Sequence, residues 1–442
     1  MSTSKTPRAK LYPISANDYL SISELKKLQL EKMQSIVNHA YANVPFYKEK
    51  WEQASFHPDH IASLEDIQNI PFIMKTDLRD NYPFGLFAVP MKDIVRLHAS
   101  SGTTGKPTVV AYTKKDIQVW AQVMARTFAS CGLGPDDIIQ NAYGYGLFTG
   151  GLGAHYGSEE LGATVIPVSG GNTDRQIMFL KDFGSTGLCC TPSYFTFIIE
   201  RAKELGFDLH ELPIRVGIFG AEPWTEEMRK HMEKKSGIKA YDIYGLSEII
   251  GPGVASECEA QSGLHIFEDH FYPEIIDPET GKILPDGERG ELVLTTLSKS
   301  ANPMIRYRTR DITTLKKYAC SCGRTIRQIT RITSRSDDML IIRGVNVFPS
   351  QIESALLRVP DITPHYQIVL FEKEGLDNIE VNVEATPEVF NNNLDGMQTL
   401  QAETVHSIYT TLGIRVKVNL VAPNTIARSE GKAQRLIDQR NK

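Results

Sequence analysis

Between residues 95 and 244 the sequence alternates short, β-like apolar runs with amphipathic stretches, and this alternation limits the possible folds more than any other feature. Alternation of this kind predicts an α/β core with a largely parallel sheet. The helix-start signals between the runs are Thr113 with Asp116, Thr173 with Gln176, and Thr191 with Pro192. The expected strands are Val95–Ser101, Thr108–Thr113, Asp137–Tyr143, Ala163–Ser169, Leu188–Thr191, Val216–Gly220 and Tyr241–Tyr244.

The segments on either side of this region have different patterns. The first ninety residues are polar and helical in character, with Ser21 and Glu24 spaced as a capping box. After about residue 260 β-like runs dominate, including Arg289–Leu297 and Met304–Thr313. We therefore expect a large N-terminal α/β domain with a β-rich subdomain, covering residues 1–336.

The last hundred residues have the pattern of a separate, small α+β domain. Ser350 and Glu353 are spaced to begin a helix, and two alternating strands, a second helix and a final strand follow. A length of roughly one hundred residues is common for a domain. We place the boundary near Asp337–Asp338 and expect residues 337–442 to form the C-terminal domain.

Composition excludes several classes of protein. The 48 basic and 53 acidic residues give a net charge of −5, which leaves no basic excess for binding nucleic acid. No apolar run reaches the roughly 20 residues that span a bilayer, and the first residues lack the apolar core of a signal peptide. Six cysteines are too few for a disulfide scaffold in a chain of this length. We expect a cytoplasmic protein that binds neither nucleic acid nor membranes.

The most informative segment is Ser100–Thr108, which reads Ser-Ser-Gly-Thr-Thr-Gly-Lys-Pro-Thr and joins two predicted strands. Backbone N–H groups and hydroxyls donate to phosphate oxygens, so this composition predicts a phosphate-binding loop. It is not a Walker A loop, because Pro107 stands where that motif has serine or threonine. The alternative is a surface turn without a ligand.

Five further segments follow this loop in order, and together with it they resemble the motifs of the adenylate-forming superfamily of acyl-CoA synthetases, peptide-synthetase adenylation domains and luciferases. They are Gly220-Ala221-Glu222-Pro223, Tyr244-Gly245-Leu246-Ser247-Glu248, Tyr307-Arg308-Thr309-Arg310-Asp311, Arg335-Ser336-Asp337-Asp338 with Gly344, and Ser429-Glu430-Gly431-Lys432. Arg310, Ser247 and Ser334 depart from the superfamily's glycine, threonine and glycine. Within the superfamily, Gly-Ala-Glu-Pro-Trp, Arg-Gly-Val-Asn-Val-Phe-Pro and Arg-Ser-Glu-Gly-Lys are similar to the phenylacetate–CoA ligase group.

The resemblance implies a ligase that works in two steps. A carboxylic acid, phenylacetate or a close arylacetate, attacks the α-phosphorus of ATP and releases pyrophosphate, and the thiol of coenzyme A then displaces AMP. The resemblance further implies Mg²⁺ and, because dimers are frequent among relatives, a homodimer. Three alternatives remain open: an adenylating enzyme with an acceptor other than CoA, as in coenzyme F390 synthetase, a non-catalytic nucleotide-binding or interaction protein, and a zinc-ribbon nucleic-acid binder.

The same resemblance assigns residues to the nucleotide. The phosphate-binding residues are Ser100, Ser101, Gly102, Thr103, Thr104, Gly105, the catalytic Lys106 and Ser247, with Glu248 as the catalytic Mg²⁺ ligand. The adenosine-binding residues are Gly220, Ala221, Glu222, Pro223, Asp242, Tyr244, Gly245, Asp311 and Arg335. A carboxylate such as Asp311 suits the ribose diol because it offers two acceptor oxygens. The alternative for Asp311 and Arg335 is a simple ion pair.

Three C-terminal residues are implied to act in catalysis and domain movement. Lys432 would enter the site and bridge the substrate carboxylate and phosphate, a role that suits a point charge on a flexible stem. Asp337 is the expected hinge, about which the mobile C-terminal domain rotates after adenylation. Gly344 would leave room for the pantetheine arm of CoA. The alternative for Lys432 is a solvated lysine near the end of the chain.

The acid pocket is expected at an aromatic, glycine-containing stretch that resembles the acid site of the superfamily. Its candidate residues are Tyr143, Tyr145, Gly146 and Phe148, with Ala221 at the floor. Small residues beside aromatic rings leave space for a flat substrate ring. The alternative is an ordinary apolar core.

The cysteines suggest a structural metal site. Cys320 and Cys322, two residues apart and followed by glycine, can supply half of a tetrahedral zinc site, which Cys258 and His265 would complete. Some members of the phenylacetate–CoA ligase group have a similar arrangement. The alternative is free thiols. The remaining cysteines, Cys131, Cys189 and Cys190, are expected to be buried small hydrophobic residues.

Overall fold

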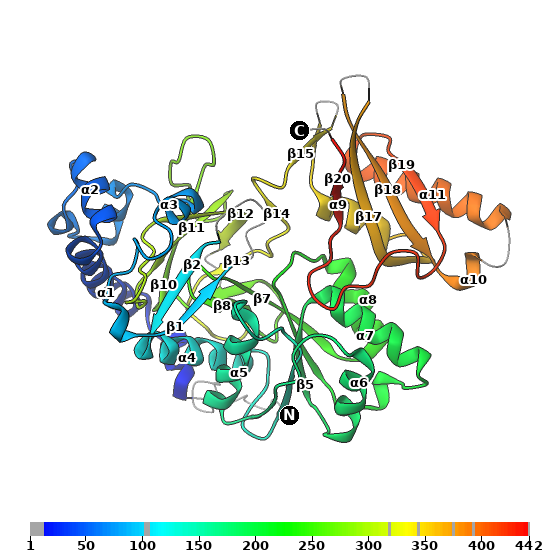
Figure 1. Ribbon diagram of the computed structural model, residues 1–442, viewed down its shortest axis with the longest axis horizontal. Helices are drawn as coiled ribbons and strands as arrows, with labels where there is room; N and C mark the ends of the chain where they lie inside the picture. Colours follow the sequence, from blue (N-terminus) through cyan, green and yellow to red (C-terminus); the bar gives the residue numbers. More distant parts are fainter. Residues whose placement is uncertain are drawn as a thin grey trace.

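The computed structural model describes residues 13–100, 107–316, 320–342, 345–373, 376–390 and 394–440. They form a large N-terminal domain and a smaller C-terminal domain, the latter coloured yellow-orange to red in Figure 1. The expected mixed α/β fold with one large and one small domain is confirmed.

One half of the main sheet is parallel. Its strands, in spatial order, are β4 (Thr164–Ile166), β3 (Ile138–Asn141), β5 (Gly187–Cys190), β6 (Val216–Phe219) and β7 (Lys239–Leu246). The helices between and around them are α4 (Lys114–Ser130), α5 (Thr149–Leu161), α6 (Thr173–Asp182), α7 (Pro192–Glu204) and α8 (Glu226–Ser236). On β6, Ile218 belongs to the core cluster shared with α4 and α5, whereas Phe219 belongs to the cluster shared with α6, α7 and α8. Helices therefore cover both faces of the parallel half (Figure 1).

In the parallel half, the helix starts follow the predicted signals with one exception. Thr113 and Thr191 cap α4 and α7 by accepting hydrogen bonds from the N–H groups of Asp116 and Tyr194. For α6 the cap is Asn172, which accepts from the N–H of Arg175, and Thr173 is already the first helical residue. The exception arises because an asparagine with its short acceptor stands one position earlier.

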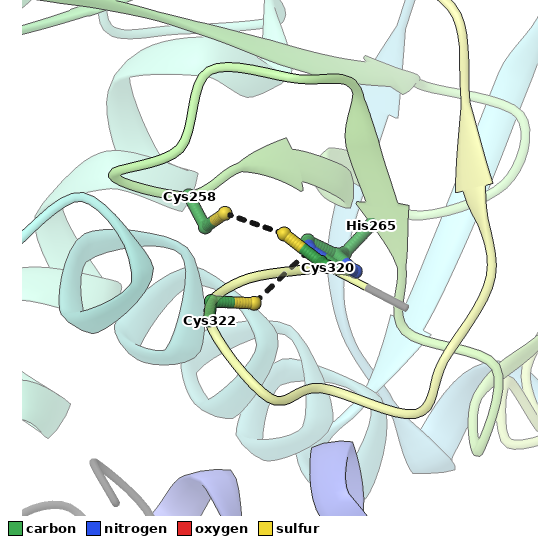
Figure 2. A group of neighbouring side chains, drawn as sticks. All are labelled: Cys258, His265, Cys320 and Cys322. Carbon is green, nitrogen blue, oxygen red and sulfur yellow. Dashed lines mark hydrogen bonds between the residues drawn. The ribbon is translucent and has the colours of Figure 1, made fainter. Parts of the chain in front are cut away.

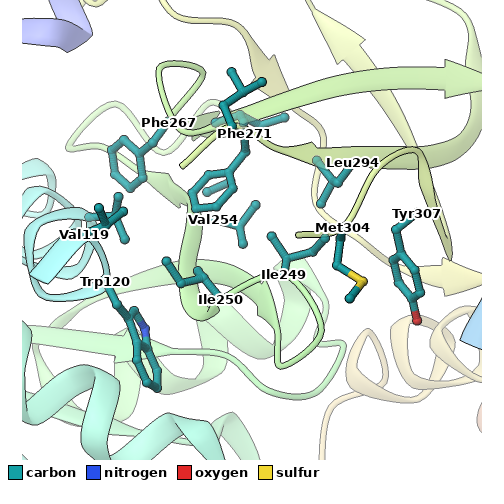
Figure 3. Close-up of a cluster of buried hydrophobic side chains, with 14 of the residues drawn as sticks. Val119, Trp120, Ile249, Ile250, Val254, Phe267, Phe271, Leu294, Met304 and Tyr307 are labelled. Carbon is teal, nitrogen blue, oxygen red and sulfur yellow. The ribbon is translucent and has the colours of Figure 1, made fainter. Parts of the chain in front are cut away.

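The other half of the sheet is antiparallel. Its strands are β8 (Gly251–Glu257), β9 (Leu264–Ile266), β10 (Phe271–Ile276), β11 (Arg289–Thr296), β12 (Tyr307–Lys316), β13 (Gln328–Ile329) and β14 (Ser334–Arg335). Across the sheet, β7 is followed by β8, β9, β13, β12, β11 and β10, with β14 paired to the side of β12. Figure 3 shows the core where this half meets α4, to which α4 contributes Val119 and Trp120 and the antiparallel half contributes Phe267 and Phe271. The β-rich subdomain thus continues the main sheet.

Two expected strands lie outside this sheet. β1 (Ile94–Ala99) and β2 (Val109–Thr113) pair with each other in a separate antiparallel ribbon. The segment that joins them is too short for the crossover that parallel strands require. The ribbon presents the two ends of the predicted phosphate loop side by side.

The N-terminal segment is helical, as predicted. It contains η2 (Pro13–Tyr19), α1 (Ile22–Asn43), α2 (Pro45–Gln53), η3 (Pro58–His60), η4 (Leu64–Asn69), α3 (Lys75–Asp80) and η5 (Met91–Asp93), and a further 3₁₀ turn, η6 (Leu209–Glu211), follows α7. Ser21 and Glu24 form the expected capping box of α1.

A buried ion network fixes the beginning of this segment. Asp18 accepts from Arg126 of α4 at 3.1 Å and from Arg324 at 3.0 Å, and Arg126 also donates to Asp269. All four side chains are almost completely buried. Because each buried charge has a partner, the network joins η2 to three distant parts of the domain at a tolerable desolvation cost.

The C-terminal domain has its own apolar core. Its elements are β15 (Leu340–Ile342), β16 (Val345–Val347), α9 (Pro349–Leu357), β17 (Ile362–Lys373), β18 (Leu376–Ala385), α10 (Pro387–Phe390), α11 (Leu394–Leu412), β19 (Lys417–Val421) and β20 (Leu436–Asp438). The strand order in its main sheet is β19-β18-β17-β20. The placement of the domain boundary at Asp337–Asp338 stays a prediction.

The predicted start of α9 is wrong. Pro349 is the first helical residue, and the side chain of Gln351 accepts from the N–H of Phe348. Glu353 does not cap this helix, because its carboxylate contacts Thr225 of the large domain instead. Among the described residues, none of the helices combines the length and apolar character needed to cross a membrane.

Candidate active site

Three residues of the predicted adenosine site form one hydrogen-bonded chain. The hydroxyl of Tyr244, at the end of β7, donates to Asp311 Oδ2 at 2.6 Å, and Arg335 Nη1 donates to Asp311 Oδ1 at 3.0 Å. The pairing of β12 with β14 sets Asp311 opposite Arg335. Burial raises the pKa of Asp311 to about 6, against the opposing effect of Arg335. The chain fixes both oxygens of the carboxylate at the edge of the sheet.

Asp337, the hinge candidate, extends this network of hydrogen bonds. Asp337 is exposed, and its carboxylate accepts from Arg335 Nε at 2.9 Å. Arg310, which replaces the superfamily's glycine, has a φ of +69°, in the left-handed region where glycine is favoured. The position therefore keeps the backbone conformation of the motif despite the larger side chain.

Of the predicted phosphate loop, the structure describes the two ends. Ser100 and Thr108 close the loop through a bond from the Ser100 N–H to the Thr108 carbonyl at 3.0 Å and through contact of their hydroxyls. Ser101, Gly102, Thr103, Thr104, Gly105 and Lys106 lie outside the described residues, as does Gly344. Ser247 Oγ lies 3.1 Å from Thr149 Oγ1 at the start of α5.

Glu248, the predicted Mg²⁺ ligand, is surrounded by two lysines that sequence reasoning missed. Lys75, at the start of α3, places its Nζ 3.5 Å from Glu248 Oε1. Lys299 is completely buried and donates to the main-chain carbonyl of Glu248 at 3.1 Å, and burial lowers the pKa of Lys299 to about 8. A cation from the N-terminal segment therefore lies against the candidate metal ligand.

The segment Gly220–Pro223 follows β6 and turns tightly. Ala221 has a φ of +72°, and a Cβ at Gly220 would lie 2.6 Å from the carbonyl oxygen of Ile243, so that position has room only for glycine. Beneath the segment, Asp242 is buried and accepts from the indole N–H of Trp224 at 2.9 Å. Burial raises the pKa of Asp242. Gly245 lies at the β7–β8 turn, where it pairs with Pro252.

Lys432 reaches this region from the C-terminal domain. Its Nζ lies 5.7 Å from the centre of the Phe148 ring, and the next residue, Ala433, donates its N–H to Glu222 Oε2 at 3.0 Å. The loop is held further by Thr191, which donates to the carbonyl of Gly431 at 2.8 Å. Lys432 stays exposed on one side, while the protein around its other side lowers its pKa by partial desolvation. The structure thus brings Lys432 and the predicted acid-binding stretch together.

The acid-binding candidates differ in exposure. Tyr143 is buried, and burial raises the pKa of its hydroxyl, whereas Gly146, Phe148 and Ala221 are exposed. The rings of Tyr143 and Phe148 lie 6.4 Å apart. Tyr145 is fixed by a bond from Asn141 Nδ2 to its hydroxyl oxygen at 2.7 Å. The stretch therefore presents an open aromatic surface over a rigid base.

The four metal-site candidates form one cluster. The ligand atoms of Cys258, His265, Cys320 and Cys322 all lie within 4.8 Å of one another. Figure 2 shows Cys258 beside Cys320, with their sulfurs 3.6 Å apart, and Cys322 beside His265, with Sγ 3.4 Å from Nε2. His265 Nδ1 lies 3.2 Å from the carbonyl oxygen of Ile326, a contact that leaves Nε2 directed at the thiols. The donor set, three sulfurs and one imidazole, fits a closed zinc site.

Comparison with known proteins agrees with this geometry. Two family models match the chain: one described as AMP-binding enzyme over residues 22–298, and one described as AMP-binding enzyme C-terminal domain over residues 344–440. Fold, site and matches together define an AMP-binding enzyme of the adenylate-forming type.

The most similar relatives identify one family within this class of enzymes. The chain is 51% identical to the phenylacetate-coenzyme A ligase of Pseudomonas putida over 98% of both chains, and 49% identical to that of Thermus thermophilus over 94% of this chain and 97% of the relative. The chain belongs to the phenylacetate–coenzyme A ligase family. The predicted superfamily and subgroup are confirmed.

Solved structures of 2-hydroxyisobutyryl-CoA ligase match almost the whole chain. In the postadenylation state, in complex with R3-HIB-AMP, that ligase has a TM-score of 0.92 at 30% identity, covering 99% of this chain and 94% of its own. In the thioesterification state, with 2-HIB-AMP and CoA, the TM-score is 0.71 at 31% identity, covering 100% of this chain and 94% of its own. The two domains here are therefore arranged like those of the postadenylation structure.

Proposed function

We propose that this protein is an AMP-forming ligase that activates phenylacetate with ATP and transfers the acyl group to coenzyme A. The observation that carries the proposal is the contact of two neighbouring small-domain residues with the large domain: Lys432 lies over the ring of Phe148, and the N–H of Ala433 donates to Glu222. Identity of about half of all residues with phenylacetate-coenzyme A ligases, over nearly the full length, supports the acid and the acceptor.

We propose that the hydrogen-bonded side chains of Tyr244, Asp311 and Arg335 bind adenosine. The Asp311 carboxylate would accept from both ribose hydroxyls, because it is the acceptor-rich group at this edge of the sheet. Glu248 would hold Mg²⁺, which typically binds one or two carboxylates together with phosphate oxygens and water. Bound there, the ion would neutralise phosphate charge. The phosphate roles of Ser100 to Lys106 and of Ser247 stay predictions.

We propose that Lys432 orients the acid for attack and stabilises the charge that develops on the phosphate. Its side chain lies over Phe148 with one side open, so a carboxylate can reach the ammonium group. Release of this lysine would require rotation of the C-terminal domain about Asp337, which would let Gly344 face the arm of CoA. The higher similarity to the postadenylation structure supports the view that the present arrangement serves the first step.

We propose that the aromatic ring of the acid lies against Tyr143, Tyr145, Gly146 and Phe148, with Ala221 beside it. The fixed Tyr145 and the exposed Phe148 ring offer a flat apolar surface. Aromatic rings pack favourably in offset or edge-to-face contact, which suits an arylacetate better than an aliphatic acid of equal length.

We propose that the cluster of Cys258, His265, Cys320 and Cys322 binds a structural zinc ion. The four donors lie close enough for tetrahedral coordination and leave no position for a substrate. The ion would tie the turn after β8 and strand β9 to the segment before β13.

Replacement of Lys75 with methionine is expected to raise the KM for ATP and to slow pyrophosphate release by about tenfold. The substitution removes a cation beside Glu248, where the charge of the leaving pyrophosphate would develop. Steady-state pyrophosphate release at varied ATP measures both effects. Lys75→Arg is the matched control and should keep most of the activity, whereas equal loss in both variants would show that shape, not charge, matters at this position.

The function is tested by pyrophosphate release across a panel of carboxylic acids, each with and without CoA. We expect release that depends on phenylacetate, with AMP and a thioester formed only when CoA is present. Release with a different acid would keep the mechanism and reject the pocket assignment. No release with any acid, although ATP and Mg²⁺ are present, would reject the proposed activity.

A further inference from the structure

Glu200 on α7 contacts two side chains of the C-terminal domain at once. Its Oε1 lies 2.6 Å from His365 Nε2 on β17, and its Oε2 accepts from Arg428 Nε at 3.0 Å. Burial alone would raise the pKa of Glu200, but His365 and Arg428 lower it overall, so the group faces them as a carboxylate. Hydrogen bonds to an ionised group are stronger than those between neutral groups. Glu200 therefore joins the two domains by a charged contact.

The arginine in this contact is held within its own domain as well. Arg428 donates from Nη1 and Nη2 to the two oxygens of Glu384, at 2.8 and 2.9 Å, and Glu384 is completely buried on β18. If the small domain rotated away from the large domain, Arg428 would keep its ion pair with Glu384 and would lose only its hydrogen bond to Glu200. Arg428 also stands four residues before Lys432 in the same loop. The contact with Glu200 consequently bears directly on the position of the catalytic lysine.

A second carboxylate at the domain boundary, that of Glu353, has partners in both domains and therefore does more than dock them. Glu353 on α9 accepts from the N–H and hydroxyl of Thr225, at 3.1 and 3.0 Å, across the boundary. It also accepts from Tyr366 at 2.9 Å and contacts Arg435, both within the C-terminal domain. Removing Glu353 would leave a hole in that domain. Glu200 is the partner whose loss affects mainly the docking of the two domains.

We propose that Glu200 is a positioning residue that holds the C-terminal domain in the arrangement for adenylation and so sets the balance between the two steps of the reaction. This inference rests on the proposed function of Lys432. Because Glu200 touches Arg428 and His365 but not the reacting groups, it acts through the loop that carries Lys432. Weakening the contacts of Glu200 shifts the population from the present domain arrangement toward the one for thioester formation.

The test compares Glu200→Gln with Glu204→Gln. Both changes remove one charge from α7, but among the described residues the ion-pair partner of Glu204 is Arg201 of the same helix. Adenylation is measured as acid-dependent exchange of pyrophosphate with ATP, and thioester formation is measured from supplied phenylacetyl-adenylate and CoA. In Glu200→Gln we expect adenylation to fall by about tenfold while thioester formation is unchanged or faster. Glu204→Gln should resemble the unaltered enzyme in both steps.

A second readout needs no substrate. The N–H of Ala433 donates to Glu222 only while the domains are docked as described here, so its hydrogen exchange reports docking. We expect faster exchange in the peptide that contains Ala433 in Glu200→Gln and no change in Glu204→Gln. This measurement stands even if the acid is different from phenylacetate, so failure of the inference and failure of the proposed function are distinguishable.

Three results would overturn the inference. One is an equal loss of both steps, which would mark Glu200 as a general stabilising residue. Another is unchanged adenylation together with unchanged exchange at Ala433. The third is a selective loss of thioester formation, which would assign Glu200 to the opposite arrangement.

Discussion

Replacement of Lys432 with alanine is expected to slow acyl-adenylate formation by a factor on the order of 10²–10³, with little effect on thioester formation from supplied adenylate. Lys432 extends from the small domain to within 5.7 Å of the centre of the Phe148 ring, and the loop that holds it is bonded to Thr191 and Glu222. Under the proposed mechanism, its cation would stabilise the charge that develops on the phosphate and would not be required once the adenylate exists. The two half-reactions, measured separately, give the comparison.

Lys417→Ala is a suitable control for this prediction. Lys417 lies on β19 of the same domain, is exposed, and pairs with Glu380 on the neighbouring strand. Loss of a surface ion pair of this kind costs at most about 1 kcal/mol, so both half-reactions should persist. If Lys432→Ala lowered both steps equally, the proposal that the two steps use different domain arrangements would be wrong for this protein.

Replacement of Cys322 with serine is expected to lower the zinc content and the thermal stability together. A serine hydroxyl is a poor ligand for zinc, and loss of one ligand from a closed four-donor site removes much of the binding free energy that stabilises the fold. We expect less than one zinc ion per chain after dialysis and a melting temperature lower by on the order of 10 °C. Metal analysis and calorimetry on the same sample measure both quantities.

The matched control is Cys131→Ser. Cys131 is buried at the end of α4 and is not one of the four clustered residues; its sulfur lies 3.6 Å from the carbonyl oxygen of Glu257, the residue before Cys258. This substitution places a hydroxyl in a buried position and can lower stability, but it should leave zinc content unchanged. Unchanged zinc content in Cys322→Ser would remove Cys322 from the set of ligands.

The fold was predictable wherever local sequence agreed with the final environment. The apolar runs predicted the strands because both faces of the parallel sheet are covered, so every residue in β5 and β6 is buried. The capping pattern at Ser350 and Glu353 failed because a tertiary contact with Thr225 outweighs a local hydrogen bond. The strand β20 was missed because Leu436–Asp438 is too short to show a period.

The candidate site was predictable from motifs but not from isolated residues. Tyr244, Asp311 and Arg335 stand in recognisable segments, and the structure joins them in one chain of hydrogen bonds. Lys75 stands in a polar helical segment without a motif. Its place depends on a main-chain bridge between Ile73 and Tyr307, more than two hundred positions apart. No local sequence pattern around Lys75 predicts its contact with Glu248.

The ion network around Asp18 has a consequence for the order in which the chain can fold during synthesis. The partners of Asp18 lie 108 and 306 positions further along the chain, at Arg126 and Arg324. Until the ribosome has made Arg324, η2 lacks one of the charges that compensate its buried carboxylate, and that carboxylate is more stable in water than buried. The small domain, in contrast, draws its core from one continuous stretch, residues 340 to 418, so its core depends on no partner from a distant part of the chain. The segment η2 is thus among the last described parts of the large domain to become native.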